Sequence, residues 1–223
     1  MYISDASVAP GDGLYCARDS LCIRGLRIRS IARVNQGNLF PAGVPGFAPG
    51  YAYKSGFLSE AEEAQLIGEI ERLPFARARY REFLANRRTV SYGGSYDFSA
   101  QQLKTAKPIA SFLHPVRNRA AAWAGCAPED FTHALVTEYA PGVGLGWHRD
   151  VPDFELVVGV SLLNGCRMRF RRYPPKPREK SIAVELEPRS IYRLQGAARW
   201  EWQHSVPSVP ALRYSITLRT LRR

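Results

Sequence analysis

The chain has 223 residues, 45% hydrophobic and 11% aromatic, which are the proportions of a globular protein with one sizeable core. No apolar run is long enough to span a bilayer, and the first ten residues lack the pattern of a secretory signal. Four scattered cysteines without a CxxC pair argue against a disulfide framework or a zinc knuckle and favour a reducing, cytoplasmic setting.

The net charge of +11 favours a polyanionic partner such as nucleic acid. The alternative is a soluble protein whose arginines are spread over solvated faces, and charge alone leaves both interpretations open.

Residues 1–45 are interrupted by glycines and prolines, and their middle is arginine-rich. We therefore expect a flexible basic arm over 1–45 and a folded domain over 46–223. The pair Ser59 and Glu62 forms a capping box that starts a helix running to about Leu73, and this helix should pack on one face of a sheet. A second helical region is expected over 108–124, interrupted at Pro115.

Between these helices, basic residues alternate with aromatic ones. Arg87 and Arg88 lead to Tyr92, a Gly-Gly pair and Tyr96, which together predict a hairpin. Such a hairpin could grip phosphates through its arginines and stack a base on its tyrosines. Taken alone, the stretch favours the simpler interpretation, a surface hairpin whose tyrosines pack on a sheet edge.

From residue 131 onward the pattern is that of a β protein. Short apolar or alternating runs predict strands at 134–139, 156–163, 167–173, 183–186, 190–194 and 212–221. Many short strands separated by glycine and proline turns indicate a sandwich or jelly roll.

Two histidines and an aspartate have the spacing of a metal site. His148 and Asp150 follow a glycine-rich bend, and residues two apart on an extended stretch point to the same side. His204 lies just before the last strand, where an antiparallel sandwich can bring it to the pair. Two imidazoles and one carboxylate form a facial triad that holds Fe(II) and leaves one side open. His114 and His133 have no carboxylate at useful spacing, and we interpret both as ordinary residues.

The last predicted strand carries a polar row made of Arg213, Ser215, Thr217 and Arg219. Buried arginines need anionic partners, and a dicarboxylate such as 2-oxoglutarate offers a carboxylate at each end. The two arginines are roughly 20 Å apart along an extended strand. We therefore assign Arg213 to the distal carboxylate and Arg219 to the metal end. The alternative is a basic edge strand in a basic protein.

The HxD pair, the distal His204 and the terminal RxSxTxR motif together resemble the AlkB-like Fe(II)- and 2-oxoglutarate-dependent dioxygenases. The resemblance covers about Phe47 to the C-terminus. It implies an α+β, mainly β fold, a double-stranded β-helix (jelly roll) with supporting N-terminal helices and a catalytic core of about 131–223. It also implies Fe(II) on the two histidines and the aspartate, and 2-oxoglutarate held by Arg213 and Arg219 with help from Tyr139.

Two positions depart from the family pattern. Thr137 and Ser215 stand where the family commonly has asparagine. Both keep a hydroxyl group that can hydrogen bond, so we retain both as predicted co-substrate contacts.

The resemblance further implies that O2 and 2-oxoglutarate are consumed while an N-methyl group leaves a nucleic-acid base as formaldehyde, as in repair of alkylated DNA. The base would have to leave its stack. We predict that Tyr92 and Tyr96 hold it, and that phosphates bind a basic rim formed by Arg87, Arg88, Arg169, Arg171 and Arg172. The expected partner of this monomer is alkylated single-stranded DNA or RNA. Two alternatives stay open: the same chemistry on a protein side chain or small molecule, and a non-catalytic basic module that binds nucleic acid.

Overall fold

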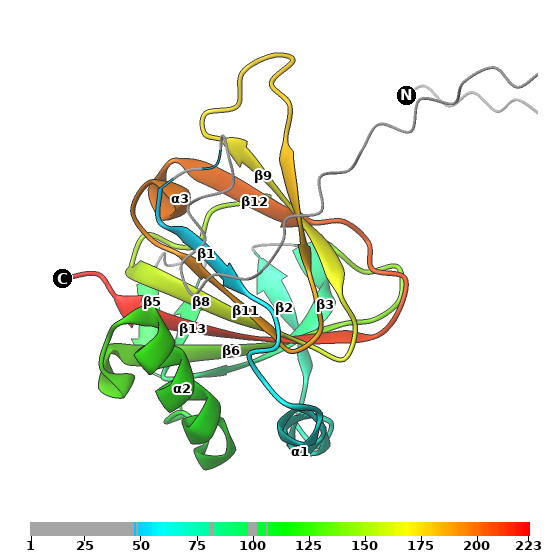
Figure 1. The fold of residues 1–223 in the computed structure, drawn as a ribbon, viewed down its shortest axis with the longest axis vertical. Coiled ribbons are helices and arrows are strands. Elements are labelled where there is room, and N and C mark those ends of the chain that lie inside the picture. Colours follow the sequence, from blue (N-terminus) through cyan, green and yellow to red (C-terminus); the bar gives the residue numbers. More distant parts are fainter. Residues whose placement is uncertain (1–46, 48, 81–82, 98–101, 106) are drawn as a thin grey trace, which may run out of the picture. The chain divides into compact units, whose positions relative to one another are not determined.

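The structure is a computed structural model that describes residues 47, 49–80, 83–97, 102–105 and 107–223, in part by backbone alone. The basic arm expected over 1–45 lies outside the described residues. Helices and strands of the described part are drawn in Figure 1.

Seven strands form the larger antiparallel sheet, in the order β1-β11-β8-β13-β6-β3-β2. They are β1 (Tyr51–Lys54), β2 (Ala76–Tyr80), β3 (Phe83–Tyr92), β6 (Phe131–Tyr139), β8 (Phe154–Leu162), β11 (Ser190–Leu194) and β13 (Arg213–Leu221). Because β13 lies between β8 and β6, both of its edges are hydrogen bonded and its two faces meet different layers.

Four strands form the smaller sheet, in the order β10-β9-β12-β7. They are β7 (Leu145–His148), β9 (Cys166–Arg172), β10 (Ile182–Leu186) and β12 (Trp202–Val206), while β4 (Gly94–Asp97) and β5 (Gln102–Thr105) form a separate two-stranded sheet. Side chains of the two main sheets share one hydrophobic cluster, in which Tyr139 and Val157 meet Met168 and Phe170. Two antiparallel sheets packed face to face confirm the predicted jelly roll.

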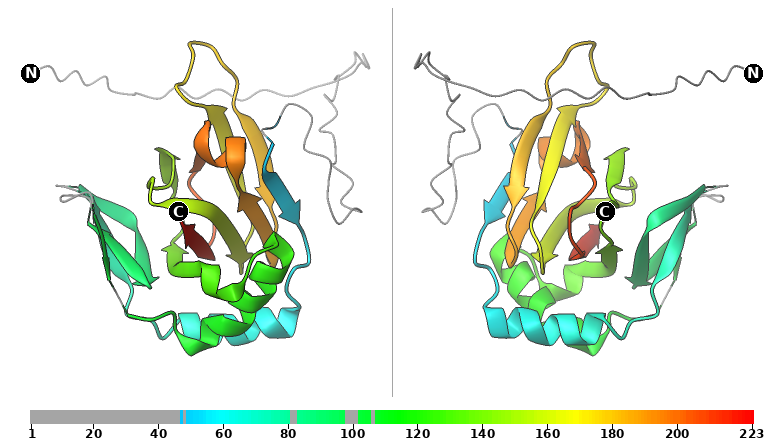
Figure 2. Two further views of the ribbon diagram at one scale, coloured as in Figure 1. Left: turned by 90° about the vertical axis from the view of Figure 1, so that its left-hand side faces the viewer. Right: turned by 90° about the vertical axis from the view of Figure 1, so that its right-hand side faces the viewer.

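Helices cover the other face of the larger sheet. The helical elements are α1 (Glu60–Ile70), η1 (Ser111–Leu113), α2 (His114–Ala124), η2 (Pro128–Asp130) and α3 (Gly196–Trp200). Leu66 of α1 and Ala120 of α2 belong to the same core cluster as Val158 and Ile216 of the sheet, and Figure 2 shows both helices on that side. The supporting helices predicted from the sequence are therefore present.

The predicted alternation of β13 is confirmed, and it separates core from site. Ile216 and Leu218 pack in the cluster that faces the helices. Arg213, Ser215 and Thr217 are also buried, at 2%, 6% and 8% exposure, on the face toward the smaller sheet. A buried polar row of this kind must find partners between the two sheets.

Local sequence signals explain how the helices begin. The Ser59 hydroxyl accepts a hydrogen bond from the Glu62 amide, and the Glu62 carboxylate accepts one from the Ser59 amide, so the predicted capping box is present. The helix ends at Ile70, three residues before the predicted Leu73. Pro115 lies in the first turn of α2 instead of interrupting a longer helix, because a first turn does not use the amide that proline lacks.

The predicted hairpin around Tyr92 is wrong. β3 pairs with β2 and β6, whereas β4 pairs only with β5 among the described residues. Gly93 has φ of +77°, and its amide donates to the carbonyl of Lys107. The Gly-Gly pair therefore bends the chain from one sheet into another. Glycine is required at position 93, because a side chain there would meet the Thr132 carbonyl.

All six strands predicted from residue 131 onward are present, with ends displaced by at most three residues. The short elements β1, β7, β12 and α3 were not predicted as such. In the described part of the chain, no helix is both long enough and apolar enough to cross a membrane.

Glu63 ties α1 to the larger sheet and generates a stability prediction. Its buried carboxylate accepts hydrogen bonds from the Leu163 amide at 2.8 Å and from Arg189 at 2.9 Å. Glu63→Ala leaves both donors without their acceptor, so we expect the free energy of unfolding to fall by about 2 kcal/mol. Urea denaturation measures this change.

Glu60→Ala is the matched control, since Glu60 also pairs with Arg189 but is 88% exposed and 3.6 Å away. We expect a change below about 0.5 kcal/mol for the control. Equal effects of the two substitutions would contradict the anchoring role of Glu63.

Candidate metal and co-substrate site

Two neighbouring strands of the smaller sheet bring two histidines side by side. His204 of β12 is paired with His148, the last residue of β7, and their ring centroids are 4.2 Å apart. Asp150 follows two residues later, with its Oδ2 3.6 Å from Nε2 of His204. One ligand atom from each residue lies within 4.8 Å of the others. The structure therefore brings together the three residues that the sequence predicts as metal ligands.

Both imidazoles are held in the neutral form that binds a metal. The Nδ1 of His148 lies 3.0 Å from the Gly146 carbonyl, so it donates its proton there and leaves Nε2 as the free ligand atom. Burial lowers the pKa of His148. Burial, with the neighbouring His148 ring, lowers the pKa of His204 from 6.5 to about 3. Neither ring then has to release a proton before it binds a cation.

Asp150 has one carboxylate oxygen that is fully used and one that is not. Its side chain is 5% exposed, and Oδ1 accepts a hydrogen bond from Nε of Arg219 at 2.9 Å and forms an ion pair with its Nη2 at 2.7 Å. Burial alone would raise the pKa of Asp150, but the charge of Arg219 overrides it and the pKa falls well below its usual range. Oδ2 is buried and has no hydrogen-bond partner among the residues that the structure describes. A buried, ionised and unpartnered oxygen beside two neutral imidazoles fits Fe(II).

A chain of side chains supports Arg219 from behind. Its Nη1 lies 3.2 Å from Nδ1 of His133, whose Nε2 lies 3.0 Å from the Ser91 hydroxyl. Burial, followed by the charge of Arg219, lowers the pKa of His133 to about 3. His133 is not one of the three clustered ligands, in line with its interpretation as a residue outside the metal site, but it helps to orient the partner of Asp150. Its position opposite Arg219 in the β6–β13 register could not be read without the strand pairing.

Arg199 is a second residue that sequence reasoning missed. It is 2% exposed, and its Nη2 lies 2.7 Å from the Val151 carbonyl, 2.9 Å from that of Phe154 and 3.2 Å from that of Asp150. One guanidinium thus holds the loop that carries the metal-binding carboxylate. The only signal in the sequence was an arginine five residues before His204.

Arg213 occupies a pocket of different chemistry. Its guanidinium lies over the Tyr139 ring at 5.1 Å, and its Nε donates to the Ser161 hydroxyl at 3.2 Å. No carboxylate of the described residues pairs with it, although it is buried. Thr137 and Ser215 lie opposite each other on the same inner face. A buried arginine without a protein anion fits the distal carboxylate of 2-oxoglutarate.

Tyr192 completes this pocket and was also missed. It lies opposite Gly159 in the β11–β8 pairing, and its ring crosses the glycine so closely that a Cβ at Gly159 would be 2.3 to 2.5 Å from ring atoms. Burial raises the pKa of Tyr192, and the charges of Asp150 and Tyr139 raise it further. The phenol therefore stays protonated as a donor between the metal side and the Arg213 side.

The predicted substrate residues have mixed outcomes. Tyr92 is 8% exposed in the core under the helices, so it cannot stack a base. Arg88 binds Glu138 through two hydrogen bonds of 2.7 and 2.8 Å on that same side, so it is not available for a phosphate. The Tyr96 side chain lies outside the described part of the structure. Arg87 has no ion pair among the described residues. Burial lowers the pKa of His148, and the charge of Arg87 is a smaller cause that lowers it further.

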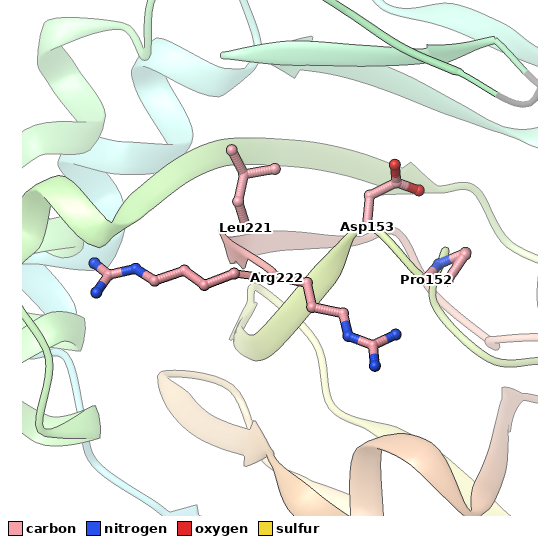
Figure 3. Close-up of a pocket in the computed structure, with 5 residues that line it drawn as sticks. Pro152, Asp153, Leu221 and Arg222 are labelled. Atoms are coloured by element: carbon pink, nitrogen blue, oxygen red, sulfur yellow. The ribbon is translucent and has the colours of Figure 1, made fainter.

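A surface hollow lies beside the loop that follows Asp150. It is lined by Pro152, Asp153, Leu221, Arg222 and Arg223, whose side chains are drawn in Figure 3. It contains neither the metal ligands nor Arg213, so we assign it no part in the site.

The comparison with protein families agrees with this geometry. The model of the 2OG-Fe(II) oxygenase superfamily matches residues 50–219. The chain therefore belongs to this superfamily of 2-oxoglutarate-dependent dioxygenases, which use Fe(II), 2-oxoglutarate and O2. Within it the chain is similar to an AlkB homologue, in agreement with the resemblance that its motifs indicate.

Two curated relatives match the chain. The Alkylated DNA repair protein ALKBH8 homolog of Arabidopsis thaliana is 31% identical over 182 residues, which is 71% of this chain and 51% of the relative. The Uncharacterized protein L905 of Acanthamoeba polyphaga mimivirus is 39% identical over 75 residues, which is 33% of this chain and 35% of the relative. The chain thus spans about half, or less, of the relatives that it matches.

Solved structures share the fold. The structure of OsALKBH1 superposes with a TM-score of 0.64 at 16% identity, over 78% of this chain and 98% of that one. A Pseudomonas putida prolyl-4-hydroxylase follows with a TM-score of 0.55 at 14% identity, over 78% and 93%. Both likenesses concern the fold alone.

The buried imidazoles generate a pH prediction for the metal-free protein. His133 and His204 have native pKa values of about 3 against an ordinary value of 6.5. Between these values only the unfolded chain binds the protons, so stability falls as the pH falls through this window. Each imidazole contributes a slope of about 1.4 kcal/mol per pH unit near pH 4.5.

Urea denaturation of the chelator-treated protein at several pH values measures this slope. In His133→Gln the slope of stability against pH should decrease by about 1.4 kcal/mol per pH unit, because one of the two titrating imidazoles is gone. An unchanged slope in the variant would refute a neutral, buried His133.

The close approach of Tyr192 to Gly159 generates a co-substrate prediction. Gly159→Ala must push the ring away, and we expect 2-oxoglutarate affinity to fall about tenfold through the loss of roughly one hydrogen bond. Calorimetric titration of 2-oxoglutarate into the Mn(II)-loaded protein measures it. Gly68→Ala is the control, because nothing lies within 4 Å of a Cβ at Gly68. An unchanged affinity in Gly159→Ala would remove Tyr192 from the pocket.

Proposed function

We propose that this dioxygenase removes methyl groups from the bases of alkylated nucleic acid, as in alkylation-damage DNA repair. The observation that carries the proposal is Arg87, a cation on the inner face of β3 that has no ion pair among the described residues. Arg88 faces the helices and pairs with Glu138, and neighbouring residues of a strand face opposite sides, so Arg87 faces the site. Burial lowers the pKa of His148, and the positive charge of Arg87 lowers it further. A phosphate next to a flipped-out base is a suitable partner for such a cation.

The residues of the chain divide the work among themselves. His148, Asp150 and His204 would hold Fe(II), and Arg213 with Tyr139 and Ser161 would bind the distal carboxylate of 2-oxoglutarate. Bound iron supplies oxidation of the N-methyl carbon, coupled to conversion of 2-oxoglutarate and O2 into succinate and carbon dioxide.

The protein itself orients and protects these groups. Arg219 fixes the carboxylate of Asp150, and Gly146 fixes the tautomer of His148. The hydrophobic cluster between the sheets keeps bulk water from this space, which strengthens every charge interaction within it.

Two other functions compete with this one. The prolyl-4-hydroxylase likeness has the same fold, so a protein side chain or a small molecule could be the substrate of the same chemistry. A non-catalytic nucleic-acid-binding module would need no ionised, unpartnered Asp150 oxygen, and the presence of that oxygen favours an enzyme. Arg87 and the net charge of +11 favour nucleic acid among the substrates.

The deciding experiment is mass spectrometry of a single-stranded oligonucleotide that carries one 1-methyladenine. The wild type, with Fe(II), ascorbate and 2-oxoglutarate, should remove the mass of one methylene group. His148→Ala should remove none, because the facial triad loses a ligand. His114→Ala is the matched control and should behave as the wild type, since His114 bonds the Ile109 carbonyl far from the triad in sequence. Arg87→Gln should raise the KM for the oligonucleotide about tenfold, the cost of one charged contact.

The remaining outcomes separate the alternatives. Succinate formation without loss of mass would send the search to protein or small-molecule substrates. Neither loss of mass nor succinate, with oligonucleotide binding intact, would favour the non-catalytic module.

A further inference from the structure

The outer face of the smaller sheet carries arginines gathered around one tryptophan. Trp147 of β7 points away from the metal site, because its neighbour His148 points into it. The guanidinium carbons of Arg169 and Arg171 lie 5.1 and 4.4 Å from the centre of its ring. Arg169 also donates to the Ser205 hydroxyl at 3.2 Å, and Arg171 to the Gln203 amide oxygen at 2.8 Å. We call Trp147, Arg169, Arg171 and these two β12 residues the outer patch.

One further cation lies beside the patch. Arg149, next to the end of β7, lies 3.9 Å from the centre of the Tyr173 ring. Arg172 of β9 is not part of the patch, because it shares a face with Phe170 and lies 5.4 Å from the ring centre of Trp202, a residue of the inner cluster. Arg167 is also excluded from the patch, since it pairs with Glu185 at 3.6 Å. Both partners of that pair are mainly exposed, at 63% and 73%, so water screens it.

Several arginines elsewhere in the described residues are neutralised by carboxylates within 4 Å. These are Arg72, Arg88, Arg119, Arg189, Arg219 and Arg223. The arginines of the outer patch touch a hydroxyl, an amide oxygen and an aromatic ring, none of which carries a negative charge. The positive charge of the patch is therefore uncompensated.

These contacts also hold the guanidinium groups in place. In each arginine of the patch, Nε donates a hydrogen bond to a β12 side chain and the guanidinium contacts the Trp147 ring. The terminal nitrogens can then donate to a ligand. A guanidinium that is already ordered loses less side-chain entropy when it binds an oxyanion. Two residues apart on a strand, the two groups form a row of cations roughly 7 Å apart. Such a row suits a polymer of phosphates better than one isolated anion.

We propose that the outer patch binds the sugar-phosphate backbone of a single-stranded nucleic acid, outside the metal site. β7 is the edge strand of its sheet and carries His148 on its inner side and Trp147 on its outer side. A nucleic-acid strand that places one base at the metal site can therefore cross the edge formed by β7 and continue over the outer patch. The inference rests on the proposed function in its choice of nucleic acid as the ligand.

The test is fluorescence anisotropy of an unmethylated, labelled 20-nucleotide DNA strand at several salt concentrations. Loss of two phosphate contacts in Arg169→Gln/Arg171→Gln should reduce the slope of log affinity against log salt by about 1.4, or about 20-fold at 0.1 M salt. Arg169→Lys/Arg171→Lys keeps both charges and should stay within about threefold of the wild type. The control is Arg72→Gln/Arg117→Gln, which removes the same charge from the helical side and should change the slope by less than about 0.3. Mn(II) affinity of each variant reports an intact fold.

Equal losses in the patch variant and the control variant would overturn the proposal, since they would reflect net charge alone. Equally tight binding of a polyglutamate peptide would also overturn it, because the patch would then fit any acidic chain. A wild type that demethylates DNA while the patch variant keeps its affinity refutes the outer patch and leaves the proposed function standing. If the wild type binds DNA through the patch but does not demethylate it, the outer patch stands and the proposed function is refuted.

Discussion

The positive charges on the inner face of β13 need negative partners inside the protein. The site depends on one such ion pair, between Arg219 and Asp150. Two charges taken out of water are tolerated only with good geometry, and here an ion pair at 2.7 Å and a hydrogen bond of 2.9 Å to the same oxygen supply it. The pair keeps Asp150 ionised, and because Arg219 uses only Oδ1, the oxygen Oδ2 remains available for a cation. Arg213, at the other end of the strand, has no such anion among the described residues, and it therefore needs one from a ligand.

This arrangement requires the three layers of the fold. A strand with a polar row on one side is stable only if its other side is fully apolar, and Ile216 and Leu218 have no exposure under the helices. The anchoring of α1 through Glu63 therefore supports the site from a distance, because it maintains the layer against which β13 packs. The smaller sheet then closes the inner face with Phe170 and Trp202, so that the buried charges meet each other and not bulk water.

Residues whose roles depend on spacing along one strand could be predicted from the sequence. The period of two in β13 and the HxD spacing both reduce to which side of a strand a residue faces, and the capping box is local as well. Roles that depend on pairing between distant strands could not be predicted. His133 meets Arg219 only through the β6–β13 register, and Tyr192 meets Gly159 only through the β11–β8 register. The errors on Tyr92 and Arg88 have the same origin, because the Gly-Gly pair resembles a turn until the separate partners of β3 and β4 are known.

The distribution of arginine gives the net charge a meaning that composition alone cannot. A charge of +11 is ambiguous because an arginine paired with a carboxylate adds nothing to the field at a distance. On the helical side the pairing is common, as for Arg88 with Glu138 and Arg119 with Glu62. On the smaller sheet Arg167 pairs with Glu185, whereas Arg169, Arg171 and the inward-facing Arg87 have no carboxylate partner among the described residues. The uncompensated charge therefore lies on both sides of the edge strand that carries His148. Because an approaching polyanion responds to this local field, the same edge that positions the metal ligands is also the one toward which such a molecule is drawn.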